Sequence, residues 1–451
     1  MKSGDAMDFH AEYRQKLVTA EEAVKAVKSG DWVDYSQCCS FPESLDAALA
    51  RRRDELTDVK IRHAISTKKV QVVENDREHQ AFTYNLWHCS GLDRSYLDKG
   101  LAYHAPMLFR NCGSYYTRGT APVDVAMVTV APMDKNGNFN YGLTNCCQQE
   151  LLDAAQTIIV EVNRNMPVIS GIANDHIHIS DVDYVVESDV PLATLPNRAP
   201  SEIDQQIAAH IFPYLHDGMT LQLGIGGMPN ALGALIAASD LKDLGMHTEL
   251  MSDGYLELYK AGKITNKKKV LNRHKGVFSI CMGTPELYAF LDCNQAILSA
   301  PMAFVNNPAV IAELDDFISI NSCIAMDLYG QICSESSGTR QISGTGGQLD
   351  FVTGAYAAEH GRAFLAMPSM YVDKKGVRHS NILPYFTQGD VITTPRTQAP
   401  YMVTEYGIAE LNGLATWQRA EKIISLAHPD FREELIKAAE AQRIWRKSNK
   451  R

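Results

Sequence analysis

The sequence has no uninterrupted apolar run of about 18 residues, which is the length that a membrane-spanning helix needs. Its first residues, up to Arg14, are polar, so we expect no signal peptide. Positive charge is not in excess: 43 Lys and Arg stand against 53 Asp and Glu, and the net charge is −10. A nucleic-acid partner would favour a basic surface, so none is expected. These absences predict a cytoplasmic globular protein that binds neither membrane nor nucleic acid.

Closely spaced cysteine pairs of the CxxC type are also missing, although the chain has ten cysteines. Two pairs are adjacent, Cys38 with Cys39 and Cys146 with Cys147. Structural zinc sites and thioredoxin-type motifs depend on the CxxC spacing. We therefore expect reduced thiols, no metal site and no bound cofactor.

The chain repeats one pattern, and its 451 residues exceed an ordinary single domain. Residues 29–50 and residues 217–237 each predict a glycine turn, a short strand, a loop, a proline and a helix. Pro42 and Pro229 are predicted at the first position of these helices, where no backbone donor is needed. Residues 133–139 and 326–332 extend the match, and each predicts a hairpin.

Alternating strands and helices predict an α/β fold with mostly parallel sheets. We expect two similar α/β domains, at residues 1–195 and 196–451, with the linker at residues 191–201. In the second domain the expected strands are residues 220–223, 247–252 and 276–281, and the expected helices are residues 230–239, 255–262, 417–427 and 429–445.

The loop after the first strand differs between the two copies. It reads Ser-Gln-Cys-Cys-Ser-Phe at residues 36–41 and Gly-Ile-Gly-Gly-Met at residues 224–228. Glycines let another molecule approach the backbone closely, and exposed N–H groups at the start of a helix bind anions. Only the second copy therefore predicts an anion or oxyanion site.

Glu249 lies in the next predicted strand, whereas residues 59–65 of the first copy contain no acid. A carboxylate among apolar strand neighbours is costly unless it is paired or used. Because the carboxyl ends of adjacent parallel strands lie side by side, Glu249 is expected near the glycine loop. A further glycine-rich segment, residues 343–351, could bring more backbone donors, or form a tight turn. His247, two residues earlier, is expected to pack.

Other functions remain open at this point. Residues 224–229 begin like a dinucleotide-binding GxGxxG motif, but Pro229 replaces the last glycine. His176 and His178 could bind a metal, although no matching ligand cluster is evident. Residues 334–338 resemble the GxSxG motif of serine hydrolases without its first glycine. A protein that binds acyl-CoA without catalysis is a further alternative.

Five stretches together resemble the family I CoA-transferases, in the acetyl-CoA hydrolase/transferase branch. They are LGIGGMPNA at residues 223–231, GMHTE at 245–249, ISIN at 318–321, ISGTGGQLDFV at 342–352 and MVTEYG at 402–407. The C-terminal segment is most similar to butyryl-CoA:acetate CoA-transferases, whereas residues 251–254 resemble the 4-hydroxybutyrate enzymes.

The resemblance implies that Glu249 is the nucleophile in a ping-pong transfer of CoA from a short-chain acyl-CoA, such as butyryl-CoA, to acetate. A glutamyl-CoA thioester would be the intermediate, and CoA would be a substrate rather than a cofactor. The alternatives are a 4-hydroxybutyrate CoA-transferase and an acetyl-CoA hydrolase that use the same glutamate. The partners implied are acyl-CoA, short-chain carboxylates and further copies of the chain in a homo-oligomer. The CoA-binding and oxyanion residues implied are Gly224, Ile225, Gly226, Gly227, Met228, Ile324, Gly347 and Lys374.

Overall fold

The computed structural model describes residues 9–195, 198–446 and 448, and these form two compact units. The first unit contains Met1–Leu195 and Phe278–Phe304, and the second contains Pro196–Val277 and Val305–Arg451. Residues 1–8 of the polar N-terminus and residues 196–197 of the expected linker lie outside the described residues. Residues 278–304 therefore group with the first unit, whereas the sequence placed them in the second domain.

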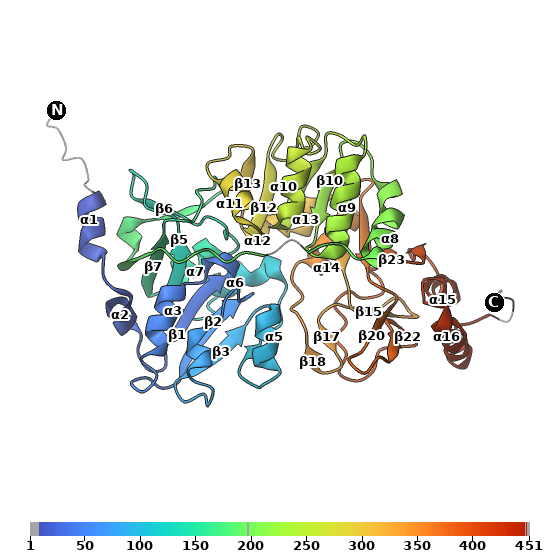
Figure 1. Cartoon of the computed structure of the whole chain (residues 1–451), viewed down its shortest axis with the longest axis horizontal. Coiled ribbons are helices and arrows are strands. Elements are labelled where there is room, and N and C mark those ends of the chain that lie inside the picture. The colour runs from blue at the N-terminus through green and yellow to red at the C-terminus, as the bar shows by residue number, and fades with distance from the viewer. Residues whose placement is uncertain (1–8, 196–197, 447, 449–451) are drawn as a thin grey trace. The chain divides into compact units, whose positions relative to one another are not determined.

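A seven-stranded parallel sheet organises the first unit, in the order β4-β3-β2-β1-β5-β7-β9 (Figure 1). The inner strand β5 (Val125–Val130), next to β1, is buried along its whole length, as expected for a parallel strand covered on both faces. The other strands of this sheet are β1 (Trp32–Gln37), β2 (Val59–Ala64), β3 (Phe82–Leu86), β4 (Tyr103–His104), β7 (Thr157–Asn163) and β9 (Tyr184–Ser188).

Short helices connect these strands, and a separate pair of strands, β6 (Asn138–Asn140) and β8 (His176–His178), is antiparallel. The helices of the first unit are α1 (Phe9–Lys16), α2 (Ala20–Ala23), α3 (Glu43–Ala50), α4 (Gln71–Glu74), α5 (Gly91–Leu97), α6 (Cys112–Thr117), α7 (Gln148–Ala154) and α11 (Pro285–Leu291). The segment 278–304 joins this unit through bridges between Thr144 and Ile280, and between Gly171 and Ser299. It also carries β13 (Ile297–Ser299) and most of β12 (Gly276–Cys281), which in strand order belong to the eight-stranded sheet β13-β12-β11-β10-β14-β19-β23-β24.

The second unit repeats the strand order of the first. Its sheet contains the run β11-β10-β14-β19-β23, all parallel, which corresponds to β2-β1-β5-β7-β9, and β24 (Gly407–Glu410) adds an antiparallel edge. The strands are β10 (Thr220–Leu223), β11 (Gly245–Met251), β14 (Phe317–Ser322), β19 (Arg362–Ala366) and β23 (Tyr401–Thr404). The predicted α/β fold with two similar, mostly parallel sheets is confirmed.

The helices of the second unit follow the predicted order with shifted ends. They are α8 (Glu202–Ile211), α9 (Gly227–Ala238), α10 (Asp253–Lys260), α13 (Pro308–Ala312), α14 (Gln348–Ala357), α15 (Thr416–Ser425) and α16 (Pro429–Ala441), and α12 (Met302–Val305) lies at the unit boundary. The predicted first-position prolines are wrong, because Pro42 precedes α3 and Pro229 is the third residue of α9. A proline is tolerated throughout the first turn, where backbone N–H groups have no partner within the helix.

Short strands outside the main sheet lie between β14 and β23 in the chain. The predicted hairpin at residues 326–332 forms from β15 (Ala325–Asp327) and β16 (Ile332–Cys333). A second hairpin pairs β20 (Met370–Val372) with β21 (Arg378–Ser380). The remaining strands are β17 (Ser336–Ser337) and β18 (Arg340–Gln341), which pair antiparallel with each other, and β22 (Ile382–Leu383), which pairs parallel with β15. Over the described part of the chain, the longest apolar helices fall short of what a bilayer crossing requires.

Candidate active site

Glu249 lies near the carboxyl end of β11, and its side chain is partly buried. Asn306, which is fully buried, donates a hydrogen bond from its Nδ2 to Glu249 Oε2 at 2.5 Å. Asn306 is the first residue after α12, and Asn307 beside it caps α13 by accepting a hydrogen bond from the Ala309 backbone N–H. The start of α13 therefore fixes the position of the amide that holds the carboxylate.

Gly347 packs directly against this pair. A Cβ atom at Gly347 would lie closer than 3.0 Å to both Glu249 Oε2 and Asn306 Nδ2, so only glycine fits there. Gly347 is also the residue that precedes α14, a helix of ten residues. The N-terminus of a helix carries a partial positive charge and free N–H groups. The carboxylate of Glu249 thus lies where negative charge is stabilised.

The glycine loop begins where β10 ends, next to β11. The hydroxyl of Thr248 donates to the carbonyl of Leu223, which is the residue before Gly224, at 3.5 Å. Gly226 has a φ of 118°, a conformation that side-chain-bearing residues rarely adopt, and directly precedes α9. The space around it is open, since a Cβ there would meet nothing within 4 Å. The predicted proximity of the loop to the strand carrying Glu249 is therefore present in the structure.

A buried polar network supports the strand ends below this loop. Gln222 Oε1 accepts hydrogen bonds from Ser319 Oγ at 2.7 Å and from Asn321 Nδ2 at 3.1 Å. The backbone N–H of Gly224 donates to Ile320 O at 3.2 Å. Satisfied buried networks fix a unique arrangement of the chain. The carboxyl ends of β10 and β14 are thus held together at the base of the loop.

His247 supports the site from within the core. It is fully buried, and its Nε2 donates to Val305 O at 2.8 Å, next to Asn306. Burial lowers its pKa to about 3, so the imidazole is neutral at physiological pH. A neutral, buried ring that orients a backbone carbonyl is consistent with the expected packing role.

Comparison with known proteins decides the family. Residues 1–196 match the model of the acetyl-CoA hydrolase/transferase N-terminal domain, and residues 283–439 match that of the acetyl-CoA hydrolase/transferase C-terminal domain. The chain belongs to the acetyl-CoA hydrolase/transferase family. The predicted membership of this family, and with it the CoA-transferase class, is confirmed.

Relatives of this family are similar over nearly the whole chain. A probable butyrate:acetyl-CoA coenzyme A-transferase of Syntrophomonas wolfei is 48% identical and covers 97% of this chain and 98% of its own. A butyryl-CoA:acetate CoA-transferase of Anaerostipes caccae is 47% identical and covers 98% of this chain and 100% of its own. The crystal structure of RipA from Yersinia pestis superposes with a TM-score of 0.90 at 35% identity, covering 97% and 100% of the two chains.

The remaining residues of the expected acetyl-CoA hydrolase/transferase site lie in different surroundings. Ile225 is 43% exposed in the loop, whereas Gly227 and Met228 are buried in the first turn of α9. Ile324 is half-buried, and its backbone N–H donates to Cys333 O. Lys374 is exposed in the turn between β20 and β21, and no hydrogen bond or ion pair among the described residues joins it to Glu249. The structure therefore brings Gly347, but not Lys374, to the Glu249 carboxylate.

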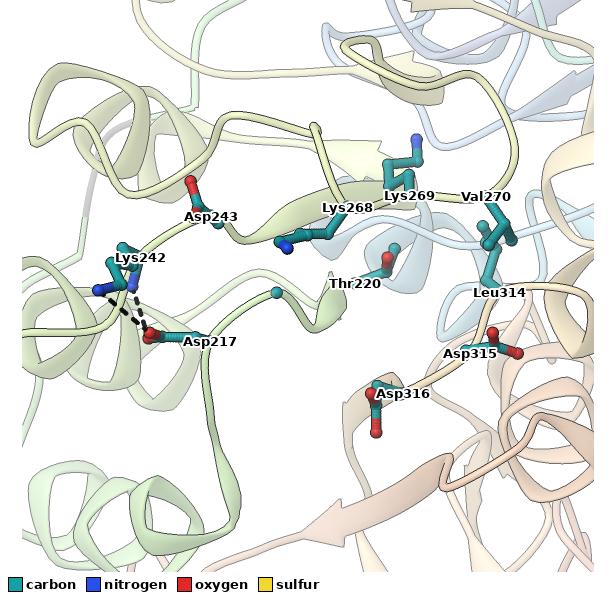
Figure 2. A pocket seen from close by; sticks show the side chains of 11 residues that line it. Asp217, Thr220, Lys242, Asp243, Lys268, Lys269, Val270, Leu314, Asp315 and Asp316 are labelled. Atoms are coloured by element: carbon teal, nitrogen blue, oxygen red, sulfur yellow. Dashed lines mark hydrogen bonds and ion pairs between the residues drawn. The ribbon is translucent and has the colours of Figure 1, made fainter.

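A separate pocket of about 490 Å³ lies at the other end of the strands (Figure 2). Thr220, the first residue of β10, lines it and pairs with Gly245 of β11. Glu249 is four residues farther along β11, which is about 13 Å at the rise of a strand. The pocket contains both charges, with Lys242 paired to Asp217. It is not continuous with the residues expected for CoA, and we assign it no role in transfer.

Two of the alternatives, a metal site at His176 and His178 and a serine-hydrolase motif at residues 334–338, have no matching arrangement among the described residues. His176 and His178 hydrogen-bond to Asp175, Ser180 and Asn136 O, and neither belongs to a ligand cluster in the described part of the chain. Residues 334–338 form parts of β17 and its flanks rather than a sharp strand-to-helix turn.

Asn306 is the site residue that sequence reasoning missed. It lies 57 positions after Glu249 and outside every glycine-rich or charged segment. The Asn-Asn-Pro sequence at residues 306–308 does signal a helix start. That signal locates α13, but the approach of its first loop to β11 depends on the tertiary fold.

Proposed function

We propose that this protein transfers CoA from a short-chain acyl-CoA, butyryl-CoA in the first instance, to acetate through a glutamyl-CoA thioester on Glu249. The observation that carries the proposal is the Glu249 carboxylate, hydrogen-bonded to Asn306 and packed on Gly347 at the start of α14. The relatives of Syntrophomonas wolfei and Anaerostipes caccae are named as a probable butyrate:acetyl-CoA coenzyme A-transferase and a butyryl-CoA:acetate CoA-transferase, which supports this choice of substrates.

In the first half-reaction, the Glu249 carboxylate attacks the thioester carbonyl of the acyl-CoA. The C–S bond breaks, and an acyl-glutamyl anhydride and the CoA thiolate are formed. The thiolate then attacks the glutamyl carbonyl, which releases the acyl group as a free carboxylate and leaves glutamyl-CoA. Splitting one difficult exchange into covalent steps lowers the barrier of each. A carboxylate nucleophile needs no base to activate it.

The second half-reaction reverses these steps with acetate. Acetate attacks the glutamyl-CoA carbonyl, the CoA thiolate leaves, and the resulting mixed anhydride is attacked at its acetyl carbonyl. The products are acetyl-CoA and the free Glu249 carboxylate. Each attack passes through a tetrahedral oxyanion that requires fixed hydrogen-bond donors. The N–H groups at the start of α14 and in the glycine loop, together with the Asn306 amide, are the donors that we assign to it.

CoA itself would lie along the glycine loop. We assign its contacts to Gly224, Ile225, Gly226, Gly227, Met228, Ile324 and Gly347, and assign Lys374 to its phosphates. The open space at Gly226 and the exposed Ile225 support a close approach of the ligand to this backbone. Lys374 is carried on an exposed hairpin turn, so its contribution depends on where the nucleotide extends.

Intact-mass spectrometry after incubation with butyryl-CoA, with no acceptor acid present, tests the proposal. We expect a gain of one CoA less one water, located at Glu249 by peptide mapping and removed by added acetate. Glu249→Ala should show neither adduct nor transfer, and Glu249→Asp should be severely slowed because its carboxylate is displaced by one methylene. Glu257→Ala, at an exposed glutamate of α10, is the matched control and should form the adduct normally.

The outcomes separate the proposed function from its alternatives. An adduct that 4-hydroxybutyrate resolves faster than acetate does would indicate a 4-hydroxybutyrate CoA-transferase. Free thiol released without any acceptor would indicate an acetyl-CoA hydrolase that uses the same glutamate. Wild-type turnover by Glu249→Ala would falsify the assignment of the nucleophile.

A further inference from the structure

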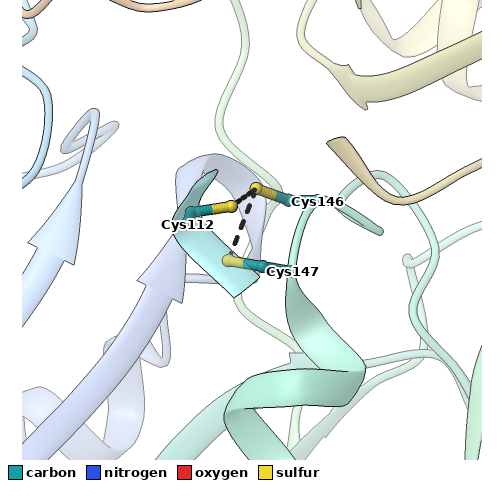
Figure 3. A group of neighbouring side chains, drawn as sticks. All are labelled: Cys112, Cys146 and Cys147. Carbon is teal, nitrogen blue, oxygen red and sulfur yellow. Dashed lines mark hydrogen bonds between the residues drawn. The ribbon is translucent and has the colours of Figure 1, made fainter. Parts of the chain in front are cut away.

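Three buried cysteines lie together in the first unit, although none belongs to a CxxC pair (Figure 3). Cys112 Sγ lies 4.0 Å from Cys146 Sγ, and Cys146 Sγ lies 3.8 Å from Cys147 Sγ. All three sulfur atoms are within 4.8 Å of one another. Figure 3 shows the sulfurs of Cys112, at the start of α6, and of Cys146 and Cys147, before α7, converging on one point.

This spacing matches a thiolate metal site. Three sulfurs at the Zn–S distance of about 2.3 Å stand about 3.8 Å apart in a tetrahedral site and about 4.0 Å apart in a trigonal one. Soft thiolate ligands select Zn²⁺ and Cu⁺ over hard cations. We propose that Cys112, Cys146 and Cys147 bind one thiophilic cation, Zn²⁺ in the first instance, as three thiolates.

The backbone holds the two adjacent cysteines in place before any ion binds. Cys146 has a φ of 43°, which is uncommon for a residue other than glycine and therefore needs support from its surroundings. Its carbonyl accepts a hydrogen bond from the Met302 backbone N–H at 2.7 Å, and the N–H of Asn145 donates to Ser279 O at 3.0 Å. Helix α6, which begins at Cys112, packs against α7. The ligands are thus fixed by hydrogen bonds independent of the sulfurs.

Polar groups around the sulfurs also suit a cation. Gln37 donates from its Nε2 to Cys147 Sγ at 3.5 Å, which favours the thiolate form of that sulfur. Glu150, in the first turn of α7, packs its carboxyl group on Gly113, next to Cys112. Its Oε2 is buried and has no hydrogen-bond partner among the described residues, and burial raises the pKa of this carboxyl. A bound cation would offset most of the negative charge that three thiolates would otherwise place near this buried oxygen.

Charge balance favours Zn²⁺ over Cu⁺. Binding requires that three thiols release three protons to solvent, which leaves a net charge of −1 with Zn²⁺ and −2 with Cu⁺. A buried net charge is costly, so the smaller charge of the Zn²⁺ site is favoured. The nearby carboxyl group of Glu150 adds to the cost of the more negative Cu⁺ site. The bound ion would join the start of α6 to the turn before α7, two segments separated by 34 residues in the sequence. Its effect would be to stabilise the first unit.

Titration of the reduced, metal-free full chain with Cd²⁺, as a spectroscopic probe for Zn²⁺, tests the proposal. We expect a thiolate-to-metal charge-transfer band that saturates at one ion per chain, and competition with a chromophoric chelator should give the Zn²⁺ affinity. Cys112→Ala and Cys146→Ala should each lower that affinity by more than about 100-fold. Gln37→Leu, which removes only the hydrogen bond to Cys147, should lower it by about 10- to 100-fold. Cys89→Ala, at a buried cysteine outside the cluster, is the matched control.

A second measurement needs no variant. Thiol alkylation in mild denaturant, mapped by peptide mass, should show that Zn²⁺ protects Cys112, Cys146 and Cys147 more strongly than Cys89 of the same unit, and leaves the labelling of Cys333 in the second unit unchanged. The same experiment with Cu⁺ compares the two cations, and stronger protection by Cu⁺ would overturn the choice of Zn²⁺. Equal affinity in wild type and Cys112→Ala, or uniform labelling with and without both metals, would overturn the site itself.

Discussion

At the scale of single residues, the Asn306 amide and the Glu249 carboxylate should act together. Asn306→Ala removes the Nδ2 donor, so we expect kcat for butyryl-CoA and acetate to fall by about 10²- to 10³-fold, with a smaller change in KM. Asn307→Ala is the comparison variant: it removes the cap of α13, at a cost of about 1 kcal/mol in stability, but leaves the Asn306 amide in place, so its kcat should fall much less. Steady-state kinetics of both variants would test this, and equal kcat values would contradict it.

Gly347 allows a prediction based on space alone. Gly347→Ala places a methyl group on the Glu249 carboxylate and the Asn306 amide, so we expect the glutamyl-CoA adduct to be lost while the protein remains folded. Gly233→Ala is the control, because this position in α9 has room for a Cβ and alanine favours the helix. Intact mass after incubation with butyryl-CoA, with circular dichroism as the check on folding, measures the difference. Normal adduct formation by Gly347→Ala would show that the Glu249 carboxylate occupies another position during the reaction.

Residues with an unusual local sequence could be proposed as site residues from the sequence, and residues with an ordinary one could not. Glu249 stands out as an acid in an apolar strand, and the glycine loop stands out against its counterpart in the first copy. Asn306 and Cys112 have unremarkable neighbours in the sequence. Their roles arise only when α13 approaches β11, and when α6 packs on α7. The absence of CxxC spacing therefore gave no indication of the cysteine cluster.

At the scale of secondary structure elements, periodicity predicted which elements exist better than where they begin and end. Strand β12 begins and ends where predicted, whereas α9 starts three residues earlier than expected. The early start follows from Gly226, whose positive φ lets the chain turn directly into the helix. A sequence pattern does not reveal that geometry, because glycine adopts positive and negative φ about equally well.

Lys269 links strand β11 to the segment before β12. Its side chain makes the stability of the second unit depend on pH. It is buried, and its Nζ donates to Met246 O in β11 and to Lys275 O before β12. Burial lowers its pKa from 10.5 to about 7. Between these values the unfolded chain binds the proton and the folded chain does not, so the free energy of unfolding contributed by this residue rises with pH from about 7 to 10.5. The slope is at most about 1.4 kcal/mol per pH unit.

Replacement of Lys269 should therefore weaken the pH dependence of the free energy of unfolding. We expect Lys269→Met to show a weaker rise in the free energy of unfolding between pH 7 and pH 10 than wild type does. Lys268→Met, at the exposed neighbouring position, should retain the wild-type slope. Urea unfolding followed by fluorescence at several pH values gives the slopes, and parallel curves for Lys269→Met and wild type would rule out a neutral Lys269 in the folded state.

At the scale of the whole molecule, the internal repeat predicted the paired sheets but not the path of the chain between the units. The strand order β2-β1-β5-β7-β9 recurs as β11-β10-β14-β19-β23, and both copies show a strand, loop and helix pattern in the sequence. The grouping of residues 278–304 with the first unit has no such signature. Their helix and strands follow the same pattern as the rest of the second half, so only the tertiary contacts assign them.

This grouping predicts that a fragment that ends at residue 195 is incomplete. It would lose the hydrogen bond from Asn145 Nδ2 to Ser299 Oγ and the bond from Tyr288 OH to Ala193 O, together with the fully buried side chains of Leu287 and Leu291. The backbone N–H of Leu195 donates to Gly283 O at 3.0 Å, so a short Gly/Ser linker can attach residues 278–304 to this end.

We expect the fragment 1–195 to bind a hydrophobic dye and to melt broadly, because burial of each large apolar side chain contributes about 1.5–3 kcal/mol. The fragment with residues 278–304 attached should melt cooperatively at a higher temperature, since the missing strand bridges and apolar contacts are restored. A fragment that carries the same 27 residues in scrambled order has the same composition and length, so it controls for the linker and added mass. Circular dichroism melts of the three fragments compare them directly. Cooperative melting of residues 1–195 alone, at the temperature of the extended fragment, would mean that the first unit is stable without the returning segment.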